Sequence, residues 1–221
     1  MKIIKWILLS AVVLLIFGFS LNYFKTKSTK KDFEGKIEYS IDVKSKNESV
    51  VTTEKLKTIY GSKMIMYFKE GNYKMCYFGE ELIAIYYLNR TNSQYTNRNG
   101  IDSLEVYNMN DEVRKLLNSK FEKTKEKVLN RKCELLINDL EQTKNYYWFD
   151  KNLYTNPENF EKHKFSFINI YYEKAKSPWL KHKYEGTNIE LTYTAVKIDE
   201  SKISTDIFKL PNLPELKLGF E

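Results

Sequence analysis

Polar and apolar residues alternate with a period of two through much of this chain. The clearest example is 33–43, in which Ile37, Tyr39, Ile41 and Val43 share one face and charged or hydroxyl side chains share the other. Such alternation is typical of a strand with one buried and one solvated face. The sequence therefore predicts a first strand here, as part of an antiparallel sheet.

Three more strands are predicted at 63–70, 73–78 and 81–88, joined by Gly71-Asn72 and Gly79-Glu80. Two-residue joins that contain glycine favour hairpins. These strands differ from the first because they carry apolar residues on both faces. We therefore expect both of their faces to be covered, by helices or by a ligand.

The stretch 121–150 predicts three consecutive antiparallel strands that fold back at Asn130 and at Asn138-Asp139. Leu136 would be the one apolar residue on one face of the middle strand. The other face of that strand would carry the remaining apolar side chains, namely Cys133, Leu135 and Ile137.

Shorter elements complete the predicted order. Further strands are expected at 94–97 and 103–108, and a closing hairpin at 180–184 and 188–198. Helical segments are predicted at three places: 48–60 (ending at Gly61), 111–117, and 156–164 with Pro157 in its first turn.

Composition agrees with a mostly β domain. Hydrophobic residues make up 42% of the 221 residues, which is enough for a packed core. The 17 Tyr and 13 Phe favour strands. We therefore expect a polar tether at 25–32, followed by one α+β, mostly β domain over 33–221, with a large antiparallel sheet and a few helices.

Residues 1–24 have the character of a leader, with a short basic start followed by an apolar run from Trp6 to Phe19. That run has the length of a signal-peptide core and is shorter than the roughly 20 residues of a spanning helix. We favour a signal peptide cleaved after Ser20. The alternative is a hydrophobic helix retained as an N-terminal membrane anchor. Either interpretation predicts an exported protein, periplasmic or associated with the cell envelope.

The net charge of +7 does not indicate a nucleic-acid partner. The lysines are scattered along the chain, and no Arg-rich or Gly-rich nucleic-acid motif accompanies them. A solvated, lysine-rich surface explains the charge.

The sequence carries no motif of a catalytic or metal site. It has no His-Glu-x-x-His, no Gly-x-Ser-x-Gly, no phosphate-binding loop and no Cys-x-x-Cys. The two histidines, His163 and His182, lie among lysines, and we interpret both as solvated surface residues. We therefore expect a non-enzymatic protein with no catalytic residue, bound metal or cofactor.

The two cysteines, Cys76 and Cys133, allow two interpretations. In an oxidising compartment they could form one disulfide, provided that their Cα atoms lie within about 7 Å of each other. Otherwise they would be two buried thiols. Both interpretations stay open at this stage.

The methionine-rich and aromatic faces also allow two interpretations. They could simply pack the sheet against its helices, or they could line an apolar pocket for a lipid or acyl chain. In the second case the predicted lining is Met64, Met66, Phe68, Met75, Ile83, Ile85, Tyr87, Leu135, Ile137, Tyr147 and Phe149.

Several short segments occur in an order similar to that of a known family. They are the runs 33–39 (Phe-Glu-Gly-Lys-Ile-Glu-Tyr), 128–133 (Val-Leu-Asn-Arg-Lys-Cys), 177–180 (Ser-Pro-Trp-Leu), 191–195 (Leu-Thr-Tyr-Thr-Ala) and 208–211 (Phe-Lys-Leu-Pro). In this order the chain resembles the GLPGLI and lipoprotein-carrier-like (LolA/LolB-like) exported proteins of Bacteroidetes type. The resemblance implies a curved sheet, a half-open barrel, with helices covering its concave face. It also implies a cavity that receives the acyl chains of a lipid or lipoprotein.

Two functional hypotheses follow. The first is an exported envelope protein that binds a lipid, acyl chain or other hydrophobic ligand in an apolar cleft. The second is a structural or protein-interaction module of the envelope, with a fully packed core, no small-molecule ligand and an envelope protein as partner.

Overall fold

The computed structural model describes residues 30–219 and separates residues 1–31 from a second unit, Asp32–Glu221. Every helix and strand of the described residues belongs to the second unit. The hydrophobic helix predicted within residues 1–24 lies outside the described residues. In the described part of the chain, no helix has both the length and the apolar character needed to cross a membrane.

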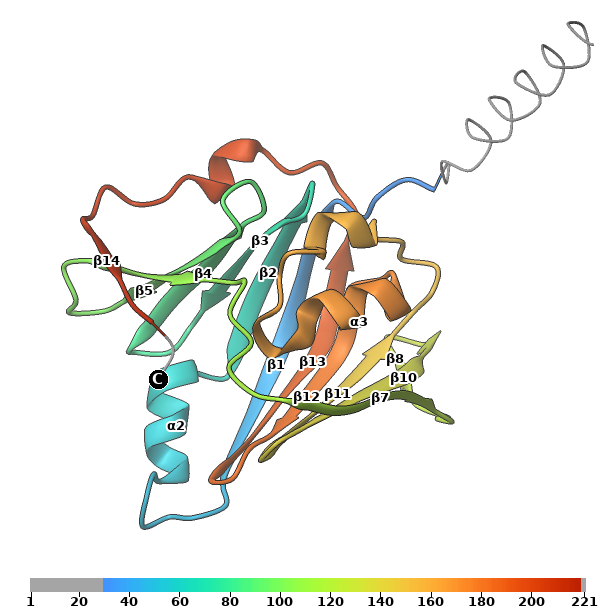
Figure 1. Cartoon of the computed structure of the whole chain (residues 1–221), viewed down its shortest axis with the longest axis horizontal. Coiled ribbons are helices and arrows are strands. Elements are labelled where there is room, and N and C mark those ends of the chain that lie inside the picture. The colour runs from blue at the N-terminus through green and yellow to red at the C-terminus, as the bar shows by residue number, and fades with distance from the viewer. Residues whose placement is uncertain (1–29, 220–221) are drawn as a thin grey trace, which may run out of the picture. The chain divides into compact units, whose positions relative to one another are not determined.

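A 12-stranded open sheet dominates the described residues, and every pairing in it is antiparallel except that of β14 with β6 (Figure 1). This confirms the predicted mostly β fold with a large antiparallel sheet. The strands follow the spatial order β14-β6-β5-β4-β3-β2-β1-β13-β12-β11-β10-β7. Their bounds are β1 (Gly35–Ser45), β2 (Lys63–Lys69), β3 (Asn72–Tyr77), β4 (Leu82–Leu88), β5 (Ser93–Arg98), β6 (Leu104–Asn108), β7 (Leu116–Glu122), β10 (Glu134–Leu140), β11 (Thr143–Phe149), β12 (Trp179–Glu185), β13 (Ile189–Asp199) and β14 (Glu215–Lys217).

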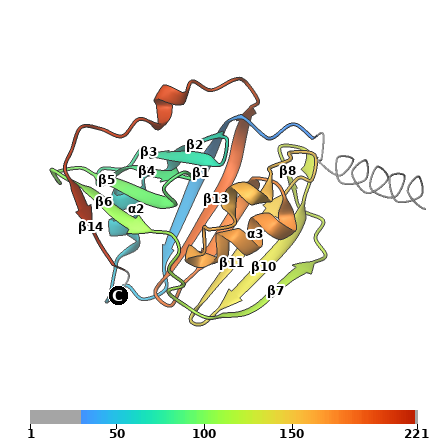
Figure 2. The ribbon, with the colours of Figure 1, turned by 45° about the horizontal axis from the view of Figure 1, so that its top comes forward.

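The strand with the clearest alternation, β1, lies at the middle of the sheet. It pairs with β2 on one side and with β13 on the other. We call β2–β6 the first arm, and β13, β12, β11, β10 and β7 the second arm. Figures 1 and 2 show the two arms on either side of β1. Tyr39 of β1 is fully buried, and its hydroxyl donates a hydrogen bond to the carbonyl of Trp179 at 2.8 Å.

The main core packs an α-helix against the inner face of the second arm. This helix, α3 (Ile168–Ala175), lies over that arm in Figure 2 and buries Tyr171 and Tyr172 completely or nearly so. The ring of Tyr171 lies 4.3 Å from that of Tyr147, and the ring of Tyr172 stacks on Phe160 at 3.8 Å. Aromatic pairs at such separations add stability beyond simple area burial. The helix therefore anchors the concave face through its tyrosines.

A second, smaller core covers the opposite face of β4, β5 and β6. Its buried members include Tyr86, Tyr95 and Leu104, and Leu210 and Leu213 of the C-terminal segment pack against them. We expected strands with apolar residues on both faces to be covered on both sides. For β4 this expectation is confirmed. The cover on this face is the extended C-terminal segment, however, and not a helix.

Two of the predicted helical segments differ in the structure. Residues 111–117 form no helix, and Leu116 begins the edge strand β7, which pairs with β10. In 156–164 only a 3-10 turn forms, at Pro157–Phe160. The α-helix follows later because Ser166 and Phe167 take left-handed conformations (φ 52° and 56°), so regular helical backbone begins at Ile168. The remaining 3-10 turns are Phe165–Phe167 and Thr205–Phe208.

The stretch 121–150 differs from its prediction in its first strand, in one turn and in the facing of its middle strand. The predicted first strand is not continuous, because β7 ends at Glu122 and residues 127–128 belong to a separate two-stranded sheet. The chain turns at Asn130, as predicted, within a separate ribbon of β8 (Lys127–Val128) and β9 (Arg131–Lys132). The second reversal comes at Glu141-Gln142 and not at Asn138-Asp139. Asn138 stays within β10 because its amide is fully buried and accepts a hydrogen bond from Ser119 Oγ at 2.7 Å.

Leu136 is the residue of β10 that faces the main core. It is fully buried and lies directly opposite Tyr147 of β11, and directly paired residues share one face of a sheet. Leu135 and Ile137 therefore lie on the other face, with Trp148 and Tyr146 opposite them. The prediction that Leu135 and Ile137 line an apolar pocket requires the opposite orientation of β10.

The helix α2 (Thr53–Tyr60) confirms the predicted 48–60 helix in its second half and ends at Gly61 as predicted. Thr52 caps its start by accepting a hydrogen bond from the Lys55 amide at 3.1 Å. Gly61 has φ 69° and ψ −165°, a backbone conformation that is essentially restricted to glycine. A Cβ at this position would also collide with the backbone of Phe78 and Gly79.

We expect Gly61→Ala to lower the free energy of unfolding by at least about 1–3 kcal/mol, because strain and the backbone collision add. Urea unfolding measures this change. Gly100→Ala is the matched control: Gly100 also has positive φ (74°), but nothing lies within 4 Å of an added Cβ. An equal loss in both variants would show that the close contact with Phe78 is unimportant.

Candidate functional site

A cavity of about 450 Å³ lies on the inner face of the sheet, between the two arms. We call it the inner cavity. Its lining comes from both arms, from the segment between β6 and β7, and from the segment between β11 and β12 that includes α3. The lining residues are Met66, Tyr73, Met75, Tyr77, Ile85 and Gln94 of the first arm; Asn145, Tyr147, Trp179, His182, Tyr184, Leu191 and Tyr193 of the second arm; and Arg114, His163, Phe165, Ser166, Ile168 and Tyr172 of the connecting segments.

The first arm presents a flexible apolar wall to this cavity. Met66 of β2 pairs with Met75 of β3, which in turn pairs with Ile85 of β4. Since paired residues share one face, the three side chains form a row across the strands. Methionine adapts its shape easily, so this row can accommodate apolar groups of different shapes.

The second arm presents a row of stacked rings. Tyr147 of β11 pairs with His182 of β12, and His182 pairs with Tyr193 of β13. The His182 ring is nearly parallel to both tyrosine rings, with centroids 4.6 Å from Tyr147 and 6.0 Å from Tyr193. This wall is rigid and aromatic, in contrast to the methionine row opposite.

His163 is buried at the rim of the first arm with only one ring nitrogen satisfied. Its Nε2 shares a hydrogen bond of 2.9 Å with the Tyr73 hydroxyl, and its ring lies 4.4 Å from that of Tyr87. Its Nδ1 has no hydrogen-bond partner among the described residues. Burial lowers the pKa of His163 to about 3, because the charged imidazolium would lose its hydration.

His182 is also neutral in this environment. Its Nε2 lies 2.9 Å from Asn145 Oδ1, and burial lowers its pKa to about 3. The interpretation of both histidines as solvated surface residues is therefore wrong. In β12 the neighbours Lys181 and Lys183 point to the opposite face from His182, as the period of two requires. That period was the sequence signal that could have placed His182 inward.

The residues predicted to line an apolar pocket separate into three groups. Those that line the inner cavity are Met66, Met75, Ile85 and Tyr147. Those buried in the main core beside it are Met64, Phe68, Tyr87 and Phe149. Those placed away from it are Leu135 and Ile137, on the other face of β10, and Ile83. Ile83 is 43% exposed because β4 shifts register between Leu82 and Ala84, which turns Ile83 outward.

Cys76 and Cys133 are both free thiols. Cys76 belongs to β3 in the first arm, whereas Cys133 precedes β10 in the second arm. Burial raises the pKa of each thiol, which disfavours the reactive thiolate. The structure therefore has two separate thiols and not a disulfide, and of the two only Cys133 is fully buried, whereas Cys76 is half-buried.

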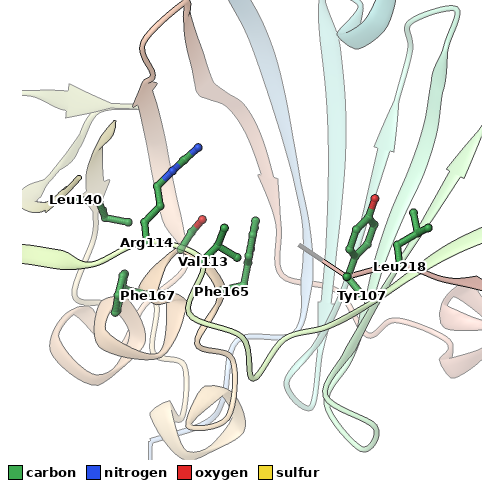
Figure 3. A pocket seen from close by; sticks show the side chains of 9 residues that line it. Tyr107, Val113, Arg114, Leu140, Phe165, Phe167 and Leu218 are labelled. Atoms are coloured by element: carbon green, nitrogen blue, oxygen red, sulfur yellow. The ribbon is translucent and has the colours of Figure 1, made fainter. Parts of the chain in front are cut away.

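A second cavity, of about 580 Å³, adjoins the first. We call it the outer cavity; Figure 3 shows its lining. Arg114, Phe165 and Ser166 line both cavities. The other lining residues of the outer cavity are Tyr107, Val113, Leu140, Phe167, Leu218 and Gly219.

The described residues contain no group of three or more His, Cys, Asp or Glu side chains that could hold a metal ion. The polar groups of the residues that line the inner cavity are instead tyrosine hydroxyls, one serine hydroxyl, one indole, two neutral imidazoles, two amides and one guanidinium. These groups can hydrogen-bond to a ligand within walls that are mainly apolar.

Comparisons with known proteins find likeness only among solved structures. No family model and no curated protein matches this chain. Two structures of PNGF-II, in different crystal forms, match with TM-scores of 0.46 and 0.43 and identities of 9% and 12%. The matches cover 84% and 83% of this chain but 32% and 31% of theirs, so the chain spans about a third of their length. Likeness at this level carries no functional argument.

Proposed function

We propose that this chain is an exported, non-enzymatic protein of the cell envelope that binds a hydrophobic ligand in the inner cavity. The observation that carries the proposal is a cavity of about 450 Å³ with methionine and aromatic walls. Binding sites for small molecules typically span about 300–1,000 Å³ and combine apolar walls with a few polar groups. The inner cavity fits that description.

The chemistry of the lining favours binding over catalysis. No carboxylate and no thiol is among the described residues that line the inner cavity. His163 and His182, with pKa values of about 3, are neutral at physiological pH and poor proton acceptors. A general acid–base mechanism with these two histidines is therefore not favoured.

Export rests on the sequence of residues 1–24 and on the resemblance to lipoprotein-carrier-like proteins. The resemblance also suggests the ligand class, an acyl chain of a lipid or lipoprotein. Cleavage after Ser20 would release the protein into the periplasm, whereas a retained helix would keep it at the membrane. Both outcomes place the domain beside lipids.

Native mass spectrometry of the full chain, expressed with its leader and purified from the envelope fraction, tests the proposal. We expect a bound mass that disappears on solvent extraction and appears in the extract as a lipid or fatty acyl compound. The same spectrum gives the mass of the chain, and a chain that begins at Met1 would contradict cleavage. A stoichiometric protein partner without any lipid would support the alternative of an envelope interaction module.

A further inference from the structure

The two adjoining cavities share a single charged residue. Among the described residues that line the inner and outer cavities, Arg114 is the one with a formal charge, since both histidines are neutral. Among the residues that the structure describes, no aspartate or glutamate lines either cavity. The electrostatic potential at their junction therefore favours an anion.

Arg114 lies where the two cavities meet. It precedes β7, in the segment that leaves the first arm for the second, and it lines both cavities together with Phe165 and Ser166. Figure 3 shows its side chain beside Val113 and Phe165, with the guanidinium extending away from Leu140 and Phe167. Arg114 is itself exposed to solvent, so its charged group lies at the solvent-accessible edge that the two cavities share.

The guanidinium of Arg114 is not engaged by a carboxylate of the described chain. None of the ion pairs among the described residues includes it. The neighbouring Glu112 is paired with Lys164 at 3.6 Å. A guanidinium can bind a carboxylate through two parallel hydrogen bonds, so Arg114 can hold one acid group.

Away from Arg114, the described residues of the inner cavity offer a charged group only neutral partners. These are tyrosine and serine hydroxyls, the Trp179 indole, amides and neutral histidines, including the unpartnered Nδ1 of buried His163. Transfer of a charge into such surroundings is costly, whereas an apolar body gains from burial. A ligand with both parts would enter with its apolar body inside and its acid group at Arg114.

We propose that the ligand is an amphiphile with a single carboxylate, which binds Arg114, and an apolar body, which fills the inner cavity. One guanidinium balances one negative charge, which favours a carboxylate over a phosphate monoester with nearly two charges. This inference rests on the proposed function and adds to it the chemical class of the ligand and its orientation.

Oleate and its uncharged counterpart oleyl alcohol, which has the same chain, test the inference. Their affinities for the delipidated full chain are measured at pH 7.5 by displacement of an uncharged fluorescent hydrophobic dye. We expect oleate to bind about tenfold more tightly than the alcohol, because a hydrogen bond to a charged group is stronger than one between neutral groups. Added salt should reduce that advantage.

Arg114→Gln should weaken oleate binding about tenfold and leave the affinity for oleyl alcohol unchanged. Arg90→Gln is the matched control, because Arg90 is an exposed arginine in the turn after β4 and lines neither cavity. Arg114→Lys keeps the positive charge and should retain part of the preference for oleate. It also serves as the test variant if the glutamine variant does not fold.

The outcomes separate the two proposals. Equal affinity for oleate and the alcohol, with no effect of Arg114→Gln, would overturn the assignment of an acidic ligand and leave the hydrophobic site intact. If neither the dye nor either probe binds, both the hydrophobic site and the acidic ligand are overturned. If Arg114→Gln and Arg90→Gln lower the affinity for oleate equally, then the protein's overall charge, and not Arg114, attracts the acid.

Discussion

Replacing Tyr171 with alanine is expected to lower the free energy of unfolding by about 3–5 kcal/mol, the range for truncation of a large buried ring. Tyr171 is fully buried in α3, its ring lies 4.3 Å from that of Tyr147, and its hydroxyl donates to the Ser177 carbonyl at 2.8 Å. The truncation would remove the ring contacts of Tyr171 in α3 with Tyr147 and Phe149 of the second arm. Urea unfolding followed by far-UV circular dichroism measures the loss.

Tyr171→Phe is the control for this prediction. It keeps the ring in place and removes one buried hydrogen bond, which should cost about 1–2 kcal/mol. If the alanine variant loses little unfolding free energy, close to the loss of the phenylalanine variant, then α3 does not hold the concave face together.

Acidification is also expected to lower the free energy of unfolding strongly. Burial lowers the pKa of His163 from its ordinary value of 6.5 to about 3, so the unfolded chain binds a proton between these pH values and the folded chain does not. The stability that His163 contributes is therefore complete above pH 6.5 and is lost as the pH falls toward 3. At pH 5 the loss amounts to about 2 kcal/mol for this residue.

His163→Gln removes this titration while keeping a hydrogen-bonding group that can face Tyr73. The free energy of unfolding, measured in urea at pH 7.5 and at pH 5, should fall about 2 kcal/mol less in the variant than in the unmodified protein. His182 titrates in the same range and should account for a residual fall in both. At pH 5 the carboxylates of Glu38 and Glu185, whose pKa values are lowered, remain charged. Identical pH dependence in both proteins would contradict the burial of His163.

The positions of β1 to β6, β12 and β13 along the chain were predictable because these strands carry regular alternation or adjoin glycine turns. The period of two in β1 and the turns at Gly71 and Gly79 are local sequence patterns, and such patterns do not depend on contacts with distant segments. The helix at 111–117 was predicted in error: residues 111–115 form neither helix nor strand, and Leu116 and Leu117 begin the edge strand β7. Pairing with β10, a tertiary contact, decided the outcome.

The candidate site was predictable only in part, for a physical reason. Met66, Met75, Ile85 and Tyr147 line the cavity as their apolar character suggested. Which apolar residues line a cavity and which fill the core depends on the curvature of the sheet, and the sequence does not encode that curvature locally. The inward histidines and Arg114 were missed for a related reason, because polar residues join a cavity only when distant segments meet.

The central position of β1 has a consequence for the time at which the protein can fold. Its residues Gly35–Ser45 pair with Ile189–Asp199, so the second arm joins the sheet's centre only after most of the chain has been synthesised. Pairings between residues so distant in sequence form slowly, because a long loop must close first. In a chain that is secreted as proposed, this late pairing would favour passage through a translocation channel before the second arm joins β1. The same delay would expose its apolar strands to aggregation, so we expect its export to depend on a holding chaperone.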